Sequence, residues 1–351
     1  MTGNASASGH IHLVGSIGLD SVEDIFRTVG KLFGSRLRRV PDGEPGPRRL
    51  WASFQYPLLR SSPYLRPDPS GAVRKNSGIP QLCLAEGVDP AEIHFGELGY
   101  AREARASYLD FCAARERGEL AKDVRFQVCL PTPMGVIYGF CTPRDLLAVD
   151  AAYEKAMIAE VEALCRAIPH RDLCLQWDFC HELIILDGQP QDMFPTVKAS
   201  LPEIMQRIAR ICAPIPPDVE LGFHLCYGDF GAKHFIEPKD MGKMVEICNA
   251  LAQAVAHPIA YIHMPVPSAR SDEAYFRPLR ELRLAPETEI YLGLVHAADG
   301  AEGTRKRMAA AHKFIDNFGI ATECGMARAR KPELVMRLLE VHREALEKEP
   351  V

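Results

Sequence analysis

The segment 222–228 places two metal-ligand side chains, His224 and Cys226, two residues apart. It follows a short apolar run and is typical of a β-strand that ends in a loop. Positions two apart on a strand point to the same face, so we expect the imidazole and the thiol to project together. Together they would form half of a zinc site. A further sulfur is most simply Cys324, which lies between another short apolar run and a glycine. These three residues predict a Zn²⁺ site.

Three protein ligands with an open fourth position are typical of catalytic rather than structural zinc, and two sulfurs with one nitrogen suit this ion. The alternative interpretation is purely structural. In that case His224 is a hydrogen-bonded core histidine, and Cys226 and Cys324 are buried apolar side chains. Spacing alone leaves both interpretations open.

Eight short β-like runs are spread along the chain, and most are nearly continuous in apolar residues, as expected of parallel strands buried on both faces. They cover residues 12–16, 37–41, 124–130, 173–178, 219–224, 259–263, 290–296 and 319–324. Helix-length segments with apolar spacings of three and four separate most of them. This alternation predicts a single (β/α)₈ TIM barrel over residues 1–351.

Helix start signals support the pattern. Acidic residues follow Ser21, and a cap residue precedes proline at Thr142-Pro143, so helices are expected to about residues 32 and 167. Similar signals begin helices near residues 237 and 331. One connection is far longer than the others. Residues 45–122 form an insertion between the second and third strands, with one helix expected over residues 100–116.

Catalytic residues of such barrels lie at the carboxyl ends of the strands. Nearly every predicted strand ends in a hydrogen-bond donor, an acid or a metal ligand. These residues are Ser16, Asp42, Glu44, Asp178, His224, Cys226, His263, His296, Glu323 and Cys324. We expect them to share one rim, where Trp177 and Tyr227 could stack on a flat alkyl donor.

The composition of the chain limits the kinds of molecule that it is expected to bind. The chain has 351 residues, a net charge of −5 and no dense cluster of basic residues, which argues against nucleic acid and membrane surfaces. No apolar run approaches the roughly 20 residues needed to span a bilayer. The amino terminus lacks the pattern of a secretory signal. Eleven scattered cysteines are typical of a reducing compartment, so we expect a cytoplasmic protein.

Six motifs along the chain resemble one family in the same order. They are Val14-Gly15-Ser16, Asp42-Gly43-Glu44 with Arg48, Leu130-Pro131-Thr132-Pro133, Gln176-Trp177-Asp178 with Glu182, His224-Leu225-Cys226-Tyr227, and Glu323-Cys324-Gly325-Met326-Ala327-Arg328. The family is the cobalamin-independent methionine synthases, and the similarity is to their C-terminal catalytic barrel.

The resemblance implies alkyl transfer to a thiol that zinc holds as a thiolate. It also implies that Glu44 and Asp178 hold the amino group of an amino-acid thiol, and that the backbone near Ser16 holds its carboxylate. The family has a histidine at the end of the seventh strand, so His296 is expected to act as general acid.

The sequence departs from the family in two places. The resemblance implies a glutamate ligand after the sixth strand, where this chain has His263. His263 is either a nitrogen ligand in its place, or the metal keeps three protein ligands. Full-length methionine synthases have two barrels and this chain has one. The thiol acceptor and the methyl or alkyl donor are therefore open, with folate and a corrinoid protein as candidate donors, and so is the formation of a homo-oligomer.

Two other functions compete with alkyl transfer. Uroporphyrinogen decarboxylase, in the same superfamily, is a metal-free lyase, and Asp178 with Arg270 or Arg328 could act in that way on a small organic acid or a phenolic substrate. A protein that merely binds a metal or a thiol is the other alternative.

Overall fold

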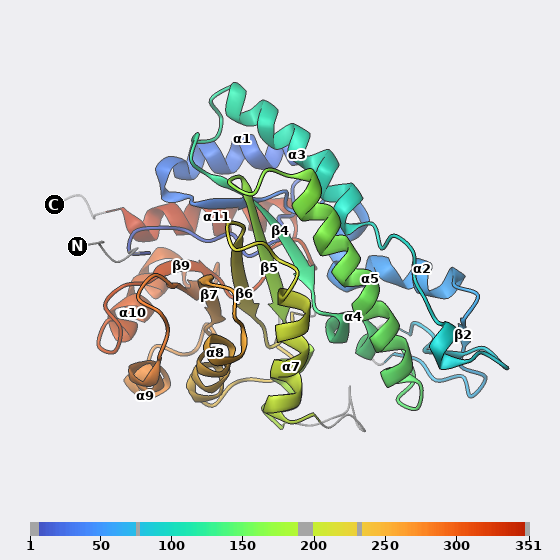
Figure 1. Ribbon diagram of the computed structural model, residues 1–351. Coiled ribbons are helices and arrows are strands. Elements are labelled where there is room, and N and C mark those ends of the chain that lie inside the picture. Colours follow the sequence, from blue (N-terminus) through green and yellow to red (C-terminus); the bar gives the residue numbers. More distant parts are fainter. Residues whose placement is uncertain (1–6, 75–77, 189–198, 230–233, 348–351) are drawn as a thin grey trace.

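Seven parallel strands form one curled sheet in the computed structural model, which describes residues 7–74, 78–188, 199–229 and 234–347 (Figure 1). The sheet order is β1-β4-β5-β6-β7-β8-β9. The strands are β1 (Arg39–Pro41), β4 (Arg125–Pro131), β5 (Leu173–Phe179), β6 (Glu220–Leu225), β7 (Ile259–Pro265), β8 (Glu289–Val295) and β9 (Gly319–Thr322). The TIM-barrel-like α/β fold predicted from the sequence is confirmed, and these seven strands agree with their predicted ranges to within two residues.

The strand predicted over residues 12–16 is wrong as a regular strand. The chain instead makes two isolated parallel bridges at Ile11, one with Leu37 beside β1 and one with Ile320 of β9, so it joins the two edges of the sheet. Beyond this point the backbone pairs with side chains. The carbonyl oxygens of Leu13 and Val14 accept hydrogen bonds from side-chain amides of β4 and β5, at 3.0 and 2.6 Å.

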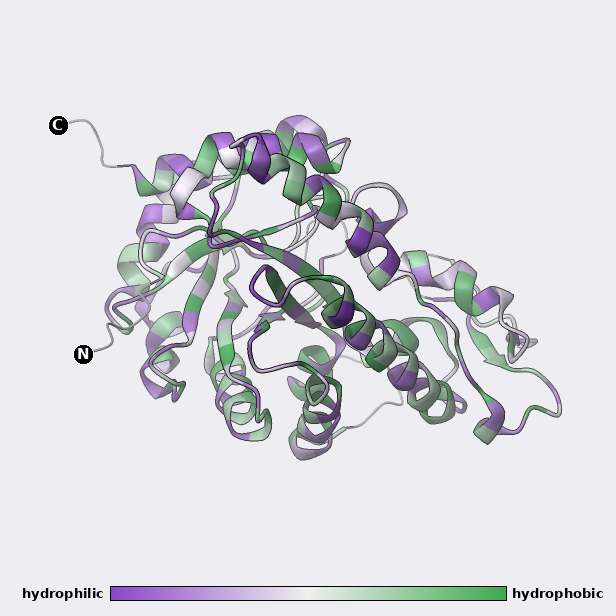
Figure 2. Cartoon of the chain, turned by 45° about the horizontal axis from the view of Figure 1, so that its top comes forward, coloured by the Kyte–Doolittle hydropathy of each residue, from purple (hydrophilic) through white to green (hydrophobic). Residues whose placement is uncertain are grey.

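Helices cover the outer face of the sheet (Figure 1). The longer ones are α1 (Val22–Phe33), α3 (Tyr100–Glu116), α5 (Leu146–Ala167), α7 (Leu201–Cys212), α8 (Gly242–Ala254), α10 (Gly300–Ala311) and α11 (Pro332–Leu346). The shorter ones are α2 (Tyr56–Ser61), α4 (Pro133–Phe140), α6 (His181–Leu186) and α9 (Glu273–Phe276). Figure 2 shows hydrophilic and hydrophobic residues interspersed along them. Helix α1 is an example. The Ser21 hydroxyl caps its first turn, and Val22, Ile25, Phe26, Val29 and Phe33 are buried against the sheet side.

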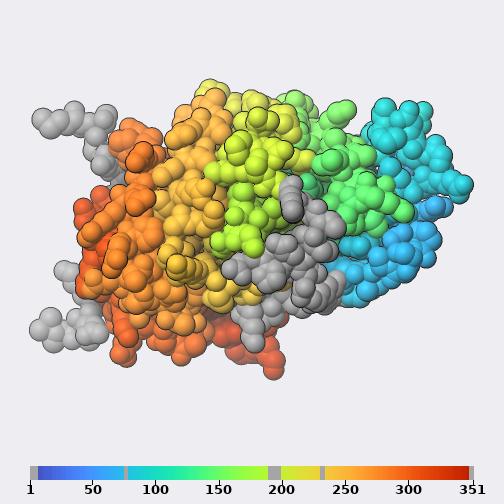
Figure 3. Space-filling view, turned by 90° about the horizontal axis from the view of Figure 1, so that it is seen from below, coloured from blue at the N-terminus to red at the C-terminus, as the bar shows by residue number. Residues whose placement is uncertain are grey.

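The long connection between β1 and β4 has structure of its own. It contains a 3₁₀ segment (Gly46–Gln55), α2, an antiparallel hairpin of β2 (Leu65–Pro67) and β3 (Leu82–Leu84), a short 3₁₀ turn and α3. The hairpin region forms one end of the molecule, coloured cyan in Figure 3. The predicted insertion is confirmed, and the helix expected over residues 100–116 is α3.

No helix in the described part of the chain is long and apolar enough to cross a membrane. The hydrophobic core fills the layer between the strands and the helices. Buried polar side chains lie inside the barrel instead, along the strands and at their carboxyl ends.

Candidate metal centre

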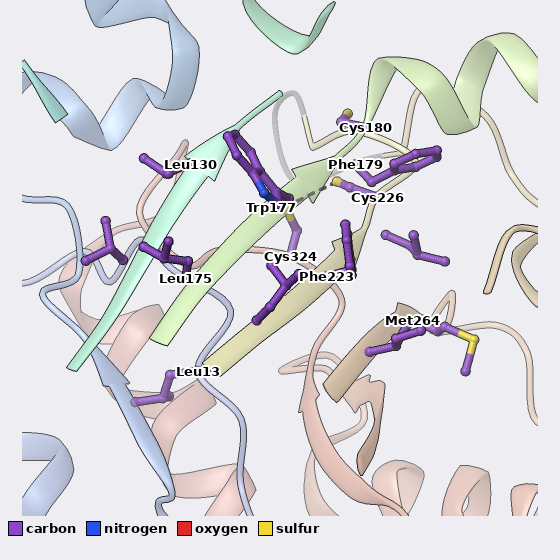
Figure 4. Packing of buried hydrophobic residues seen from close by; sticks show 14 of the residues in the cluster. Leu13, Leu130, Leu175, Trp177, Phe179, Cys180, Phe223, Cys226, Met264 and Cys324 are labelled. Carbon is purple, nitrogen blue, oxygen red and sulfur yellow. Dashed lines mark hydrogen bonds between the residues drawn. The ribbon is translucent and has the colours of Figure 1, made fainter. Parts of the chain in front are cut away.

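His224, Cys226 and Cys324 meet in space. Their ligand atoms all lie within 4.8 Å of one another, and all three residues are buried. The two sulfurs are 3.6 Å apart, and Cys324 Sγ is 3.7 Å from His224 Nε2. Figure 4 shows the Cys226 and Cys324 side chains pointing toward each other near the carboxyl ends of the strands. The predicted convergence of an imidazole and two sulfurs is therefore present.

The two separations that involve Cys324 fit one small tetrahedral ion, and the separation of Cys226 from His224 lies within 4.8 Å. Zinc–sulfur and zinc–nitrogen bonds of about 2.3 and 2.05 Å at a tetrahedral angle place two sulfurs about 3.8 Å apart, and a sulfur and a nitrogen about 3.6 Å apart. Each sulfur also accepts a hydrogen bond, one from the Gly228 N–H at 3.2 Å and one from Arg328 Nη2 at 3.6 Å. Such donors favour thiolates over thiols. The donor set and its spacing suit a soft divalent cation.

Without a cation, the same surroundings keep the two cysteine thiols protonated. A hydrogen bond with Cys180, together with burial, raises the pKa of Cys226 well above the usual thiol range, although the hydrogen bond with Cys324 opposes this change. A hydrogen bond with Cys226 and burial raise the pKa of Cys324 in the same way. Burial lowers the pKa of His224 far below its usual value, so its imidazole is neutral. Metal binding would therefore displace thiol protons.

His263 contacts His224 but does not belong to the cluster of three metal-ligand residues. Residues His224 and His263 are direct partners across β6 and β7, and their Nδ1 atoms are 2.7 Å apart. Only Nε2 of His224 faces Cys324, so Nδ1 is the atom that contacts His263. Burial lowers the pKa of His263 to about 3, which leaves it neutral. The structure thus places His263 where it orients a ligand, rather than at the fourth ligand position predicted from the sequence.

A cavity opens above the three ligands and encloses about 870 Å³ outside the protein atoms, part of it open to solvent. His224, Cys226 and Cys324 all line it, as do the predicted site residues Ser16, Glu44 and Asp178. Gly325 allows the loop after β9 to approach Ser16 closely, because a Cβ there would lie 2.3 Å from Ser16 Oγ.

Two carboxyl groups in this cavity have unusual acidities. Burial, reinforced by the charge of Asp178, raises the pKa of Glu44 to about 8. Burial also raises the pKa of Asp178 to about 7, although hydrogen bonds oppose the change. These bonds come from Gln176 Nε2 and from Trp51 Nε1, each at 2.9 Å. At neutral pH Glu44 carries a proton, whereas Asp178 is close to its midpoint.

Arg328 stands beside the sulfurs. It is partly buried, and its guanidinium carbon lies 5.9 Å above the ring of Trp51. The three non-glycine residues with positive φ among the described ones are Glu44, Trp51 and Ala329, which follows Arg328. Strained backbone of this kind persists where the surrounding structure holds it, often at functional sites. The strain therefore marks the same rim as the ligands.

Besides His263, three predicted site residues do not line the cavity. Trp177 lies between Gln176 and Asp178 on β5, so its side chain points out of the barrel, beside Cys212 of α7. Tyr227 is fully buried next to His234. The imidazole of His296 is held by the Val266 carbonyl oxygen, 2.8 Å from its Nε2. Neither Trp177 nor Tyr227 lines the cavity, and neither does His296, so their roles in donor stacking and in acid catalysis stay predictions.

Several cavity residues escaped the sequence analysis, and Trp51 and Arg74 are two of them. Both belong to the long insertion, where no alternating strand pattern predicts which side chains face the cavity. Strand alternation could have excluded Trp177, since Asp178 next to it was expected to point inward. Nothing in the spacing of the insertion could have supplied Trp51 in its place.

The sequence matches no protein-family model, and no curated protein is similar enough to it to be a relative. The structure resembles a B12-independent methionine synthase from Shewanella sp. W3-18-1 in complex with selenomethionine, with a TM-score of 0.57 and 15% sequence identity. That match covers 95% of this chain and 97% of the other. A carboxyl transferase domain of Rhizobium etli pyruvate carboxylase gives a TM-score of 0.34 over 73% of this chain, with 15% identity and 41% of the other chain covered. A putative phosphonomutase from Burkholderia cenocepacia J2315 gives 0.35 over 86%, with 10% identity and 91% of the other chain covered. The first similarity shows a shared fold.

Proposed function

We propose that this chain is a zinc-dependent transferase that moves a methyl or small alkyl group onto or from a thiol. The observation that carries the proposal is the convergence of His224, Cys226 and Cys324 on one side of an open cavity. All three ligands line that cavity, so the fourth tetrahedral position faces it. The likeness to a methionine synthase supports the reaction class.

The protein groups have separate tasks in this scheme. A bound zinc ion would lower the pKa of a substrate thiol and keep it nucleophilic. Asp178, fixed by Gln176 and Trp51, orients a cationic or hydrogen-bond-donating part of the substrate. Glu44 is protonated at neutral pH and lines the same cavity, so it replaces His296 as the group that protonates the leaving group. The identity of the alkyl donor, folate or corrinoid protein, stays a prediction.

Metal analysis of the purified full chain tests the proposal. We expect about one zinc per chain, with two sulfurs and one nitrogen in its X-ray absorption spectrum. Cys226→Ser and Cys324→Ser should lose the metal. Cys248→Ser is the matched control, because Cys248 is an equally buried thiol that contacts Met264 outside the site. Metal-replete protein that contains no zinc would refute the transferase.

A metal-free lyase is the second candidate, because Asp178 and the partly buried Arg328 line the same cavity. Arg270, the other arginine considered for that role, instead pairs with Asp272 at the surface. The lyase predicts that Cys324→Ser leaves turnover of an organic acid intact. Loss of both zinc and activity in that variant would exclude it.

A further inference from the structure

Two arginines in the cavity lack an acidic partner. Arg74 comes from the insertion and Arg328 from the loop after β9, and both line the cavity. In the described part of the chain, neither guanidinium forms an ion pair with a carboxylate. The guanidinium carbon of Arg74 lies 5.1 Å from the centre of the Phe140 ring. Burial and the nearby positive charge of Arg328 lower the pKa of Arg74. Part-buried arginines are usually paired, so two unpaired ones in a cavity need an explanation.

The other charges of the cavity do not neutralise them. Asp229 is already paired with Arg330, at 2.7 Å. Glu44 is protonated at neutral pH, and burial keeps His181 neutral by lowering its pKa to about 3. A divalent cation held by two thiolates adds no net charge. Among the described residues that line the cavity, Asp178 alone cannot offset two guanidinium groups, so these residues carry a net positive charge.

We propose that Arg74 and Arg328 form a binding site for an anionic group on the thiol substrate, which makes the substrate a short thiol acid. The inference rests on the proposed function, since it assumes that the thiol binds the metal. Arg328 Nη2 lies 3.6 Å from the ligand sulfur Cys324 Sγ, so a bound acid group and a metal-bound thiol would be separated by a short carbon chain. Arginine retains further donors for a carboxylate, sulfonate or phosphate.

The position of Arg74 gives the insertion a task. The methyl-transfer chemistry needs only residues at the ends of the barrel strands, whereas Arg74 follows the β2 strand of the hairpin insertion. Its guanidinium reaches the same cavity as the three metal ligands. The insertion therefore contributes to the selection of the substrate and not to the metal centre.

The test uses the full chain with cobalt in place of zinc, where a new thiolate ligand changes the visible absorption. Mercaptopropionate and mercaptoethanesulfonate are titrated against neutral mercaptoethanol and cationic cysteamine. We expect the anionic thiols to bind at least about tenfold more tightly, as charged hydrogen bonds imply. Arg74→Gln should remove that preference while leaving mercaptoethanol binding unchanged, and Arg74→Lys should retain part of it. Arg328→Gln should also remove the preference, and it should weaken the binding of every thiol, because Arg328 donates to the ligand sulfur of Cys324.

Arg270→Gln is the control, because this half-buried arginine is paired with Asp272 outside the cavity. Equal affinity for anionic and neutral thiols would overturn the anion site and leave the transferase standing. An equal loss of affinity for both thiols in Arg74→Gln would also overturn it. If no thiol of any charge changes the cobalt spectrum, the thiol site itself is wrong and both proposals fall. Should Arg328→Gln fail to fold, Arg74→Gln still decides between these outcomes.

Discussion

Replacing His263 tests how the metal centre is held. The Nδ1 atoms of His224 and His263 are 2.7 Å apart, and both residues are buried. When Nε2 of His224 binds a metal, its Nδ1 must carry the proton and donate it to His263. His263→Leu removes the acceptor. His263→Asn keeps one, because the asparagine amide oxygen occupies nearly the position of Nδ1.

The magnitude follows from burial. A fully buried donor left without an acceptor costs about 1–3 kcal/mol, and this is roughly a 5- to 150-fold loss of metal affinity. Measured effects of such outer partners, about 10- to 100-fold, fall in the same range. His263→Leu should therefore weaken zinc binding by one to two orders of magnitude, and His263→Asn should keep most of the affinity.

Competition with a chromophoric chelator measures the affinity, and X-ray absorption counts the ligands. Both variants should retain two sulfurs and one imidazole nitrogen. If His263→Asn loses a nitrogen from the coordination sphere, His263 is itself a ligand and the reasoning is wrong. Wild-type affinity in His263→Leu would equally refute it, because the buried hydrogen bond would then contribute nothing.

The remaining predictions concern the ligands, the acid and the loop. Cys324→Ser should abolish stoichiometric zinc binding but leave the circular dichroism of the fold unchanged; full zinc in that variant would contradict the site. Glu44 has a carboxyl pKa of 4.5 when unfolded and about 8 when folded, so the folded state binds the extra proton and stability falls as pH rises through this window, by up to about 1.4 kcal/mol per unit. Urea unfolding of Glu44→Gln should lack this slope, and an unchanged slope would show that Glu44 ionises normally. Gly325→Ala places a methyl group 2.3 Å from Ser16 Oγ and should cost about 1–3 kcal/mol, whereas Ser16→Gly should restore much of that loss; no loss in the single variant would mean that the loop adapts freely.

The sheet could be predicted from the sequence because its strands are buried on both faces. Strands β4 to β9 are short apolar runs bounded by polar residues, and that pattern depends only on local sequence. The segment after Ile11 could not be assigned in this way. Its carbonyls bond to Gln127 and Gln176, which are more than a hundred residues away in the chain. Local apolar content does not distinguish this pairing from a regular strand.

The metal ligands could be predicted because each lies at or near the end of a predicted strand. The residues around the ligands could not, because their positions depend on how neighbouring strands are aligned. His263 was expected near the metal, and its contact with His224 follows from their direct pairing across β6 and β7. Parity along β5 and β6 also explains why Trp177 and Tyr227 point away from the cavity. Trp51 and Arg74 reach it from an insertion whose path depends on tertiary packing, which a single sequence does not encode in its spacing.

Register also determines the charge of the centre. Asp178, His224 and His263 are successive partners across β5, β6 and β7, so their side chains form one row at the same height in the barrel. A carboxylate ligand at the third position, as the family resemblance implies, would give the protein ligands three negative charges. With a neutral imidazole there, they carry two, which balance a divalent cation. A substrate thiolate then adds the first excess negative charge, and Arg328, 3.6 Å from Cys324 Sγ, is positioned to compensate it. In the proposed transferase, the histidine at position 263 and the arginine at position 328 would thus act in the same direction, toward binding a negatively charged substrate.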